Sequence, residues 1–206
     1  MTTIRFIGDV HGSPRAYRRA VGDAERSIQV GDFGLGFVRM PQLGPGHRFI
    51  RGNHDCPDLC RERPDWIPDG MIEGECMFVG GATSIDAHLR VPGVSWWPDE
   101  QLSMVELHRM VELYRRHRPQ VMVTHECPAS VARELFLRHY KLAIEDRSNT
   151  REAFEVMLEI ARPRLWVFGH WHEWRDQVIG GTRFICLPEP GDIGPPGFAD
   201  LEVALP

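Results

Sequence analysis

Side chains that bind divalent cations or move protons stand at five places in this 206-residue sequence, each directly after a short apolar run. A single Gly-Asp pair is commonly a turn, and a single buried histidine is more often a hydrogen-bonded core residue than a ligand. Five such groups in one chain are hard to produce by chance. They comprise Asp9 and His11, then Asp32, then Asn53, His54 and Asp55, then His125, and finally His170 with His172.

The apolar runs before these residues predict the strands that must position them. Such continuous runs favour strands that are buried on both faces of a sheet. Ligands of open α/β sheets bind beyond the carboxyl ends of the strands. We therefore expect the polar groups to meet at one edge, after runs that cover residues 4–9, 27–32, 48–55, 77–82, 121–126 and 165–170.

Helical patterns lie between several of these runs. Ser13 followed by Pro14 has the form of an N-cap and a first helical residue, and predicts a helix to about residue 23. Apolar spacing over 99–117 predicts another helix, which Pro119 ends. Further helices are expected at 129–138 and 150–162, strands in the tail 174–206, and loops over a site at 33–46, 84–98 and 139–149.

The order and spacing of the polar groups resemble the calcineurin-like metallophosphoesterases, whose pattern is DxH, GD, GNH[DE], a separate His and GHxH. The matching segments are GDVHG at 8–12, GD at 31–32, GNHD at 52–55, His125 in VTHECP and GHWH at 169–172. The resemblance implies an α/β protein with a four-layer α/β/β/α sandwich, in which two stacked mixed β-sheets are flanked by helices. We expect residues 1–206 to form a single domain of this kind.

The resemblance also implies two divalent metal ions. The first would bind Asp9, His11, Asp32 and His172, and the second Asp32, Asn53, His125 and His170. Two cations about 3.5–4 Å apart need an anionic bridge, here Asp32, and neutral imidazoles complete each shell without excess negative charge. This donor set suits Mn²⁺, Fe, Ni²⁺ or Zn²⁺, and we favour Mn²⁺.

Residues next to the ligands are expected to act on the substrate. In the family, the histidine that matches His54 faces the scissile phosphate, and Asp55 would orient it. The implied reaction is in-line attack on phosphorus by a metal-bridging hydroxide. Arg51 has two open roles, contact with a substrate phosphate or fixing of its own loop. Packing is the expected role of most nearby aromatic residues, which can also stack a nucleobase: Phe33, Phe37, Trp96, Trp97, Trp171 and Trp174.

Two departures from the protein phosphatases of this superfamily bear on the substrate. Their GD motif continues as GDxVDRG, whereas this chain has GDFGLGF, and His172 completes a GHxH that they lack. We therefore favour a phosphodiesterase for small nucleotides, including cyclic nucleotides. Because GDVHG and RGNH look phosphatase-like, a phosphomonoesterase or protein phosphatase is the alternative. A noncatalytic binding scaffold would have lost ligands, and none of the expected ligands is missing.

Composition excludes other classes of function. The chain has 24 basic and 29 acidic residues and a formal charge of −5, which argues against a long nucleic acid as partner and against a nuclease. No apolar run approaches 18 residues, and the first residues do not resemble a secretory signal, so we expect a cytoplasmic protein without a membrane partner. The five cysteines include no CxxC pair and are expected to be reduced.

Overall fold

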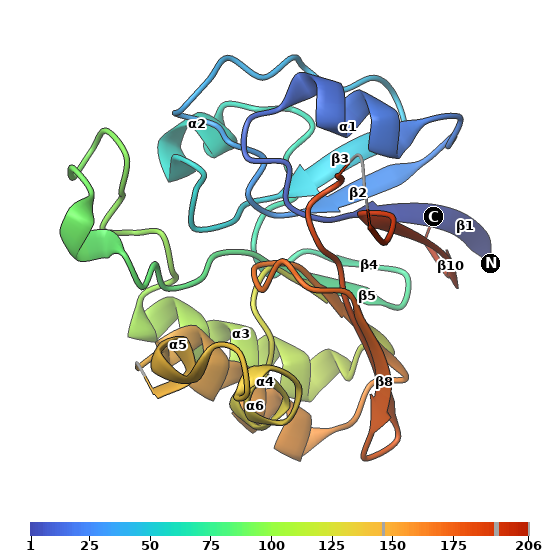
Figure 1. Ribbon diagram of the computed structural model, residues 1–206. Helices are drawn as coiled ribbons and strands as arrows, with labels where there is room; N and C mark the ends of the chain where they lie inside the picture. Colours follow the sequence, from blue (N-terminus) through green and yellow to red (C-terminus); the bar gives the residue numbers. More distant parts are fainter. Residues whose placement is uncertain (146, 192–193, 206) are drawn as a thin grey trace.

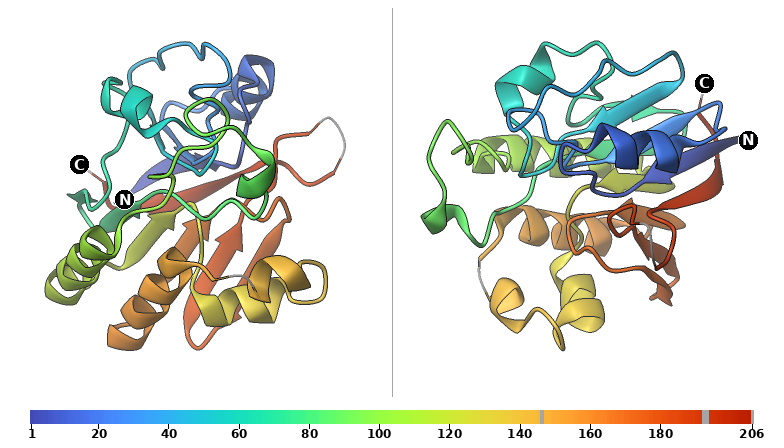
Figure 2. Two further views of the ribbon diagram at one scale, coloured as in Figure 1. Left: turned by 90° about the vertical axis from the view of Figure 1, so that its left-hand side faces the viewer. Right: turned by 45° about the horizontal axis from the view of Figure 1, so that its top comes forward.

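The computed structural model describes residues 1–145, 147–191 and 194–205. Two β-sheets stack face to face, and helices cover the outer face of each sheet (Figure 1). Two further views show the same layers (Figure 2). The predicted four-layer α/β/β/α sandwich is therefore confirmed.

The first sheet has the strand order β10-β1-β2-β3. Strands β1 (Thr2–Ile7), β2 (Ser27–Val30) and β3 (His47–Ile50) run parallel, and β10 (Phe198–Val203) pairs antiparallel with β1. Helices α1 (Pro14–Val21) and α2 (Pro57–Arg61) lie on its outer side (Figure 1). Because β1, β2 and β3 are parallel, the residues that follow them emerge at the same edge.

The second sheet has the order β4-β5-β6-β7-β9-β8. Strands β5 (Cys76–Val79), β6 (Val121–Thr124), β7 (Leu165–Phe168) and β9 (Thr182–Cys186) are parallel, and the short β4 (Ile72–Glu73) and β8 (Arg175–Ile179) are antiparallel additions. Four helices cover its outer face: α3 (Met104–His117), α4 (Ala129–Phe136), α5 (Lys141–Glu145) and α6 (Asn149–Ile160).

Apolar side chains fill the space between the sheets. Phe6 and Val30 from the first sheet and Phe78 and Val167 from the second belong to one buried cluster. Separate clusters join the second sheet to α3, α4 and α6, and the first sheet to α1 and α2. The strands are therefore packed on both faces, as their continuous apolar sequences predict, and their ends are held rigidly.

Local signals set the helix boundaries. Ser13 accepts a hydrogen bond from the amide of Ala16 at 3.2 Å, so α1 begins where the sequence predicts. Helix α3 begins at Met104 rather than at residue 99, because Ser103 and Glu106 form a capping box there. The prediction of an irregular segment over 139–149 is wrong in part, since it contains α5.

Each strand ends before its polar group, so the groups lie in the loops that follow. The short elements β4, α2 and the 3₁₀ turn Ala87–Leu89 were not predicted, because each is too brief to show a periodic pattern. Among the described residues, the structure contains no helix of the length and hydropathy that a bilayer crossing requires.

Candidate metal centre

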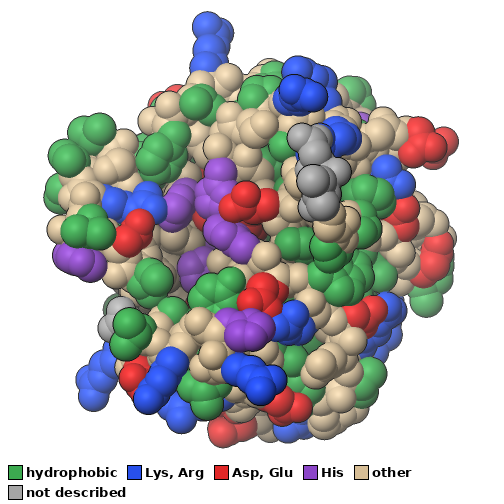
Figure 3. Space-filling view, viewed as in Figure 1, with side chains coloured by type: hydrophobic (Ala, Val, Ile, Leu, Met, Phe, Trp, Pro, Cys, Tyr) green, Lys and Arg blue, Asp and Glu red, His purple; other side chains and the backbone are tan. Residues whose placement is uncertain are grey.

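Histidine and acidic side chains from both sheets gather in a hollow on one face of the molecule (Figure 3). Asp9 and Asp32 follow β1 and β2 of the first sheet, and His125 and His170 follow β6 and β7 of the second. These four residues contact one another directly or through neighbours, so the side chains expected at this edge do lie together there.

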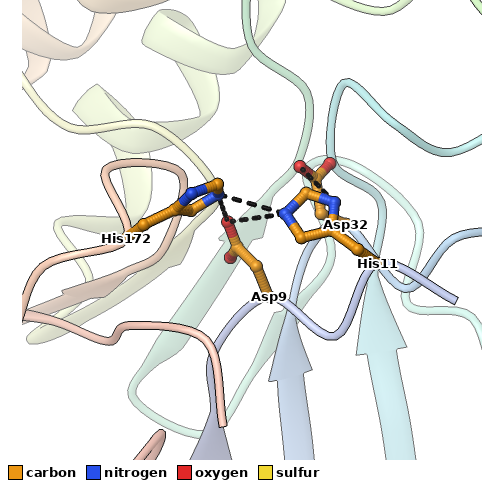
Figure 4. A group of neighbouring side chains, drawn as sticks. All are labelled: Asp9, His11, Asp32 and His172. Carbon is orange, nitrogen blue, oxygen red and sulfur yellow. Dashed lines mark hydrogen bonds and ion pairs between the residues drawn. The ribbon is translucent and has the colours of Figure 1, made fainter. Parts of the chain in front are cut away.

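Four of the expected ligands form one compact group (Figure 4). The ligand atoms of Asp9, His11, Asp32 and His172 all lie within 4.8 Å of one another. His172 Nε2 is 3.0 Å from Asp9 Oδ2, and His11 Nδ1 is 3.8 Å from Asp32 Oδ2. His11 Nε2 and His172 Nε2 are 3.1 Å apart. Two carboxylates and two imidazoles therefore converge on one point, as a divalent cation requires.

A second group lies on the other side of Asp32. His125 Nε2 is 3.3 Å from Asp32 Oδ1 and 3.0 Å from Asn53 Oδ1, and the His170 ring centroid is 5.0 Å from that of His125. Asp32 thus directs Oδ2 toward the first group and Oδ1 toward the second. A carboxylate placed in this way could be shared by two cations, one at each group.

The backbone at this edge is held in an unusual conformation. Among the described residues, five other than glycine have a left-handed φ, and four of them are expected ligands: His11 (43°), Asp32 (57°), His170 (69°) and His172 (53°). Such a conformation costs on the order of 1–3 kcal/mol at each residue and persists only where the surroundings impose it. These four side chains are thereby turned toward the two groups of expected ligands.

Glycine is required at two positions where the chain approaches the ligands. A Cβ atom on Gly52 would overlap the Asp32 carboxylate, and one on Gly169 would overlap Asp9 Oδ1. The amide after Gly169, that of His170, donates to both oxygens of Asp9, at 3.2 and 3.0 Å. The glycine of GNHD therefore provides space for a carboxylate of its own sheet, and the glycine of GHWH for a carboxylate of the other sheet.

The electrostatics of the two groups favour positive charge. Burial alone would raise the pKa of Asp32, but the nearby His125 holds that pKa well below its usual value. Burial alone would lower the pKa of His125 and of His172, but Asp32 and Asp9 respectively raise them. Burial and the nearby His125 keep the pKa of His170 well below its usual value, so its imidazole is neutral, the form that binds metals. The donor set therefore fits two divalent cations.

Residues that showed no motif in the sequence support the ligands. Asn53 Nδ2 donates to Ser84 Oγ at 2.9 Å, and Ser84 Oγ donates to Glu100 Oε2 at 2.6 Å. This buried chain fixes the Asn53 amide with its oxygen toward His125. Ser84 lies in an irregular loop, so neither periodicity nor spacing could have identified it.

Two glutamates contact histidines of the centre, and neither was predicted from the sequence. Glu189 Oε1 is 3.2 Å from His172 Nδ1 and 3.3 Å from His11 Nε2. Glu126 is buried and places Oε2 at 3.7 Å from His170 Nε2. Glu126 follows His125 directly in VTHECP, and that position was the only available signal.

His54 lies at the rim of the cavity beside the two groups, with its amide donating to Asp32 Oδ1 at 2.8 Å. Asp55 was expected to orient the His54 ring. Instead, its carboxylate accepts hydrogen bonds from four backbone amides, those of Phe33, Gly34, Leu35 and Gly52, at 2.6–3.0 Å. Asp55 therefore fixes the loop after Asp32. The His54 ring instead contacts Arg90, whose Nη2 lies 2.9 Å from His54 Nε2.

Arg51 fixes its own loop, which is one of the two roles expected for it. Its side chain is buried, with Nε 2.8 Å from Asp69 Oδ2 and Nη1 donating to the carbonyl oxygens of Asp99 and Glu100. It fixes loops and does not line the cavity beside the ligands. Phe33, Trp97 and Trp171 are buried, as packing residues should be, whereas Phe37 is 42% exposed with its ring centroid 5.9 Å from that of His54.

The chain is similar to solved structures of low sequence identity. The phosphopantetheinyl hydrolase PptH from Mycobacterium tuberculosis is 16% identical, with a TM-score of 0.53, and the match covers 97% of this chain and 95% of that one. A putative 5′-nucleotidase from Staphylococcus aureus is 16% identical, with a TM-score of 0.49, over 92% of this chain and 49% of that one. The chain thus spans about half the length of the Staphylococcus aureus protein.

A comparison with curated proteins found no match. The family model described as calcineurin-like phosphoesterase matches residues 2–174. That range includes every expected ligand, from Asp9 to His172. The chain therefore belongs to the calcineurin-like phosphoesterase family.

Proposed function

We propose that this protein is a binuclear metal-dependent phosphodiesterase that hydrolyses small nucleotides, including cyclic nucleotides. The observation that carries the proposal is the position of Asp32, whose two carboxylate oxygens face two separate groups of ligand side chains. Two divalent cations held there would lower the pKa of a bound water and neutralise charge on a phosphoryl group.

A cavity next to Asp32 provides space for the substrate. Its volume is about 220 Å³, and Asn53, His54, His170 and His172 line it together with Asp32. Pockets for drug-sized ligands typically measure roughly 300–1,000 Å³. The cavity is therefore suited to a phosphoryl group and the atoms next to it, with the rest of the substrate outside.

His54 is the proposed group that acts on the leaving oxygen. It lines the cavity, and its backbone is fixed by the amide hydrogen bond to Asp32. Its imidazole can donate a proton to the oxygen that leaves phosphorus, as a general acid does. Asp55 supports the site indirectly, because its carboxylate holds the loop that carries Phe33 and Leu35.

Two observations support a nucleotide diester. The loop after Asp32 has Leu35 and Gly36 where the protein phosphatases have a second acid and an arginine, and Asp55 accepts from the amides of Gly34 and Leu35 in this loop. The exposed ring of Phe37 is close to that of His54 and offers a surface on which a base can stack.

The test is one comparison of substrates with Mn²⁺, Fe²⁺, Ni²⁺ or Zn²⁺ added separately to the metal-free protein. We expect turnover of bis-p-nitrophenyl phosphate and of 2′,3′- or 3′,5′-cyclic nucleotides, with the highest rate in Mn²⁺, and slower turnover of p-nitrophenyl phosphate. Turnover of the monoester alone would replace the proposal with a phosphomonoesterase. Absence of turnover with every metal would favour a binding scaffold.

A further inference from the structure

An irregular loop, residues 84–98, projects beside the metal centre and is visible as the green segment at the left of Figure 1. It brings Asp86 and Arg90 to the wall of the cavity that His54, His170 and His172 also line. Arg90 Nη2 is 2.9 Å from His54 Nε2. A guanidinium group therefore lies at the proposed site of phosphoryl transfer, although no family motif contains it.

The guanidinium of Arg90 is held in a fixed orientation. Nε and Nη2 donate to the two oxygens of Asp86, at 2.8 and 2.7 Å, and Nη1 donates to the carbonyl oxygen of Ser95 at 3.2 Å. The Arg90 side chain is only 16% exposed. An arginine with this bidentate support is pre-organised to bind an anion, since little side-chain entropy remains to be lost.

The loop is also tied to the metal ligands. Ser84, at its start, links Asn53 to Glu100, and its amide donates to Glu100 Oε1 at 2.7 Å. Further along, the Val91 amide donates to Ser95 Oγ at 3.0 Å. The Ala87 amide donates to the Ser84 carbonyl oxygen at 3.3 Å and the Arg90 amide donates to that of Ala87 at 3.1 Å, so a short series of hydrogen bonds positions Arg90 relative to the second ligand group.

The contact between Arg90 and His54 identifies a place for an anion. Arg90 has only donors, so His54 Nε2 must accept in this contact. A phosphoryl oxygen is a stronger, charged acceptor than an imidazole nitrogen. When it enters the cavity, Arg90 can donate to that oxygen in place of His54.

We propose that Asp86 and Arg90 form the substrate-selecting element of this site. Arg90 binds a non-bridging phosphoryl oxygen, while Asp86 holds Arg90 and disfavours the second negative charge of a phosphomonoester. The inference rests on the proposed phosphodiesterase function and explains how the site selects a monoanionic diester.

The first experiment measures the binding of inorganic phosphate and of dimethyl phosphate to the Mn²⁺-loaded protein by calorimetry. We expect Arg90→Ala to weaken phosphate binding about 10- to 100-fold, as loss of a charged hydrogen bond does, with Arg90→Lys intermediate. We expect Asp86→Asn to strengthen phosphate binding about threefold to tenfold relative to dimethyl phosphate, because only phosphate carries the second charge.

The second experiment compares turnover of bis-p-nitrophenyl phosphate and p-nitrophenyl phosphate by the same proteins. Arg90→Ala should raise KM more than it lowers kcat, and Asp86→Asn should lower the ratio of diester to monoester kcat/KM. Arg183 and Asp176 provide the matched control, because they form a bidentate pair at 2.8 and 2.7 Å between β8 and β9 and do not line the cavity. Arg183→Ala and Asp176→Asn should leave all these values unchanged.

The metal content of Arg90→Ala distinguishes two roles of Arg90, substrate binding and support of the metal centre. Unchanged metal content with weaker phosphate binding in Arg90→Ala supports the proposal. Loss of metal from Arg90→Ala, or phosphate binding equal to that of the unmodified protein, would overturn it. If the unmodified protein turns over neither ester, the proposed function fails, while phosphate binding still decides whether Arg90 is an anion site.

Discussion

Glu189 Oε1 lies 3.2 Å from Nδ1 of His172, whose other ring nitrogen, Nε2, lies 3.0 Å from Asp9. The imidazole is therefore held between two carboxylates, that of Asp9 and that of Glu189. A metal-binding histidine commonly donates its second N–H to such a carboxylate, which fixes the ring and makes its free nitrogen more basic.

Glu189→Gln should therefore weaken metal binding at the first group by about 10- to 100-fold. The side chain is 51% exposed, so the fold should tolerate the change. Titration of the metal-free protein with Mn²⁺ in a calorimeter measures the effect. Glu112→Gln is the control, since the Glu112 carboxylate pairs with the exposed Arg115 of the same helix, α3. Equal affinity in the unmodified protein and in Glu189→Gln would show that Glu189 does not orient His172.

The residues of the centre that the sequence predicted share one property. Each lies within four residues of the end of a strand with a clear apolar pattern, and parallel pairing within each sheet brings such positions to one edge. The continuous apolar runs therefore sufficed to place Asp9, Asp32 and His125 at one edge, although they say nothing about distances.

The residues that the sequence did not predict come from irregular segments. Ser84, Arg90 and Glu189 lie in loops without periodicity, and their partners are distant in the sequence: Arg90 is 36 residues from His54. The role of Arg51 could not be decided from the sequence for the same reason. Its side chain is oriented by Asp69, which lies 18 residues further along the chain. Side-chain pairing of this kind depends on how the loops fold over the sheets.

Asp32 and His54 should differ in how their loss affects metal content. Asp32→Ala removes the carboxylate that both ligand groups share, so both metals should be lost and diester turnover should disappear. His54→Asn leaves every expected ligand in place, so metal content should stay unchanged while kcat falls about 10²- to 10⁴-fold, as for loss of a general acid. Elemental analysis and a bis-p-nitrophenyl phosphate assay measure both effects. An Asp32→Ala protein with full metal content would contradict the bridging role.

Gly169→Ala should disrupt the centre without changing any ligand. The added Cβ would overlap Asp9 Oδ1, so either the carboxylate or the loop must move. We expect loss of metal from the first group, measured by elemental analysis after gel filtration. Gly44→Ala is the matched control, because the nearest atom to its Cβ would be His47 Cδ2 at 3.7 Å, an ordinary contact. Normal metal content in Gly169→Ala would show that this loop has room to adjust.

The stability of the metal-free protein should depend on pH partly through Asp65. Burial alone would raise the pKa of this carboxyl, but Arg63 and the Leu43 amide hold it below its usual value. The lowered pKa contributes stability that is present above the unfolded pKa, about 3.9, and is lost as the pH falls through the folded value. Asp65→Asn should therefore destabilise the protein by about 1–3 kcal/mol at pH 6 and by less at pH 3. Urea unfolding at both values measures the difference, and an equal loss at both pH values would contradict this assignment.

Removal of metal should lower the thermal stability of the protein, because Asp9 and Asp32 are buried and the cations would balance their charge. A ligand present at 100 times its Kd stabilises the folded state by about 2.7 kcal/mol. For a chain of this size, each kcal/mol corresponds to about 2–4 °C in Tm. Chelation should therefore lower Tm by about 5–10 °C, and added Mn²⁺ should restore it, as measured by calorimetry. Asp32→Ala serves as the control, since its Tm should respond to neither treatment. A Tm that is the same with chelator and with Mn²⁺ in the unmodified protein would mean that the folded state binds no cation at this centre.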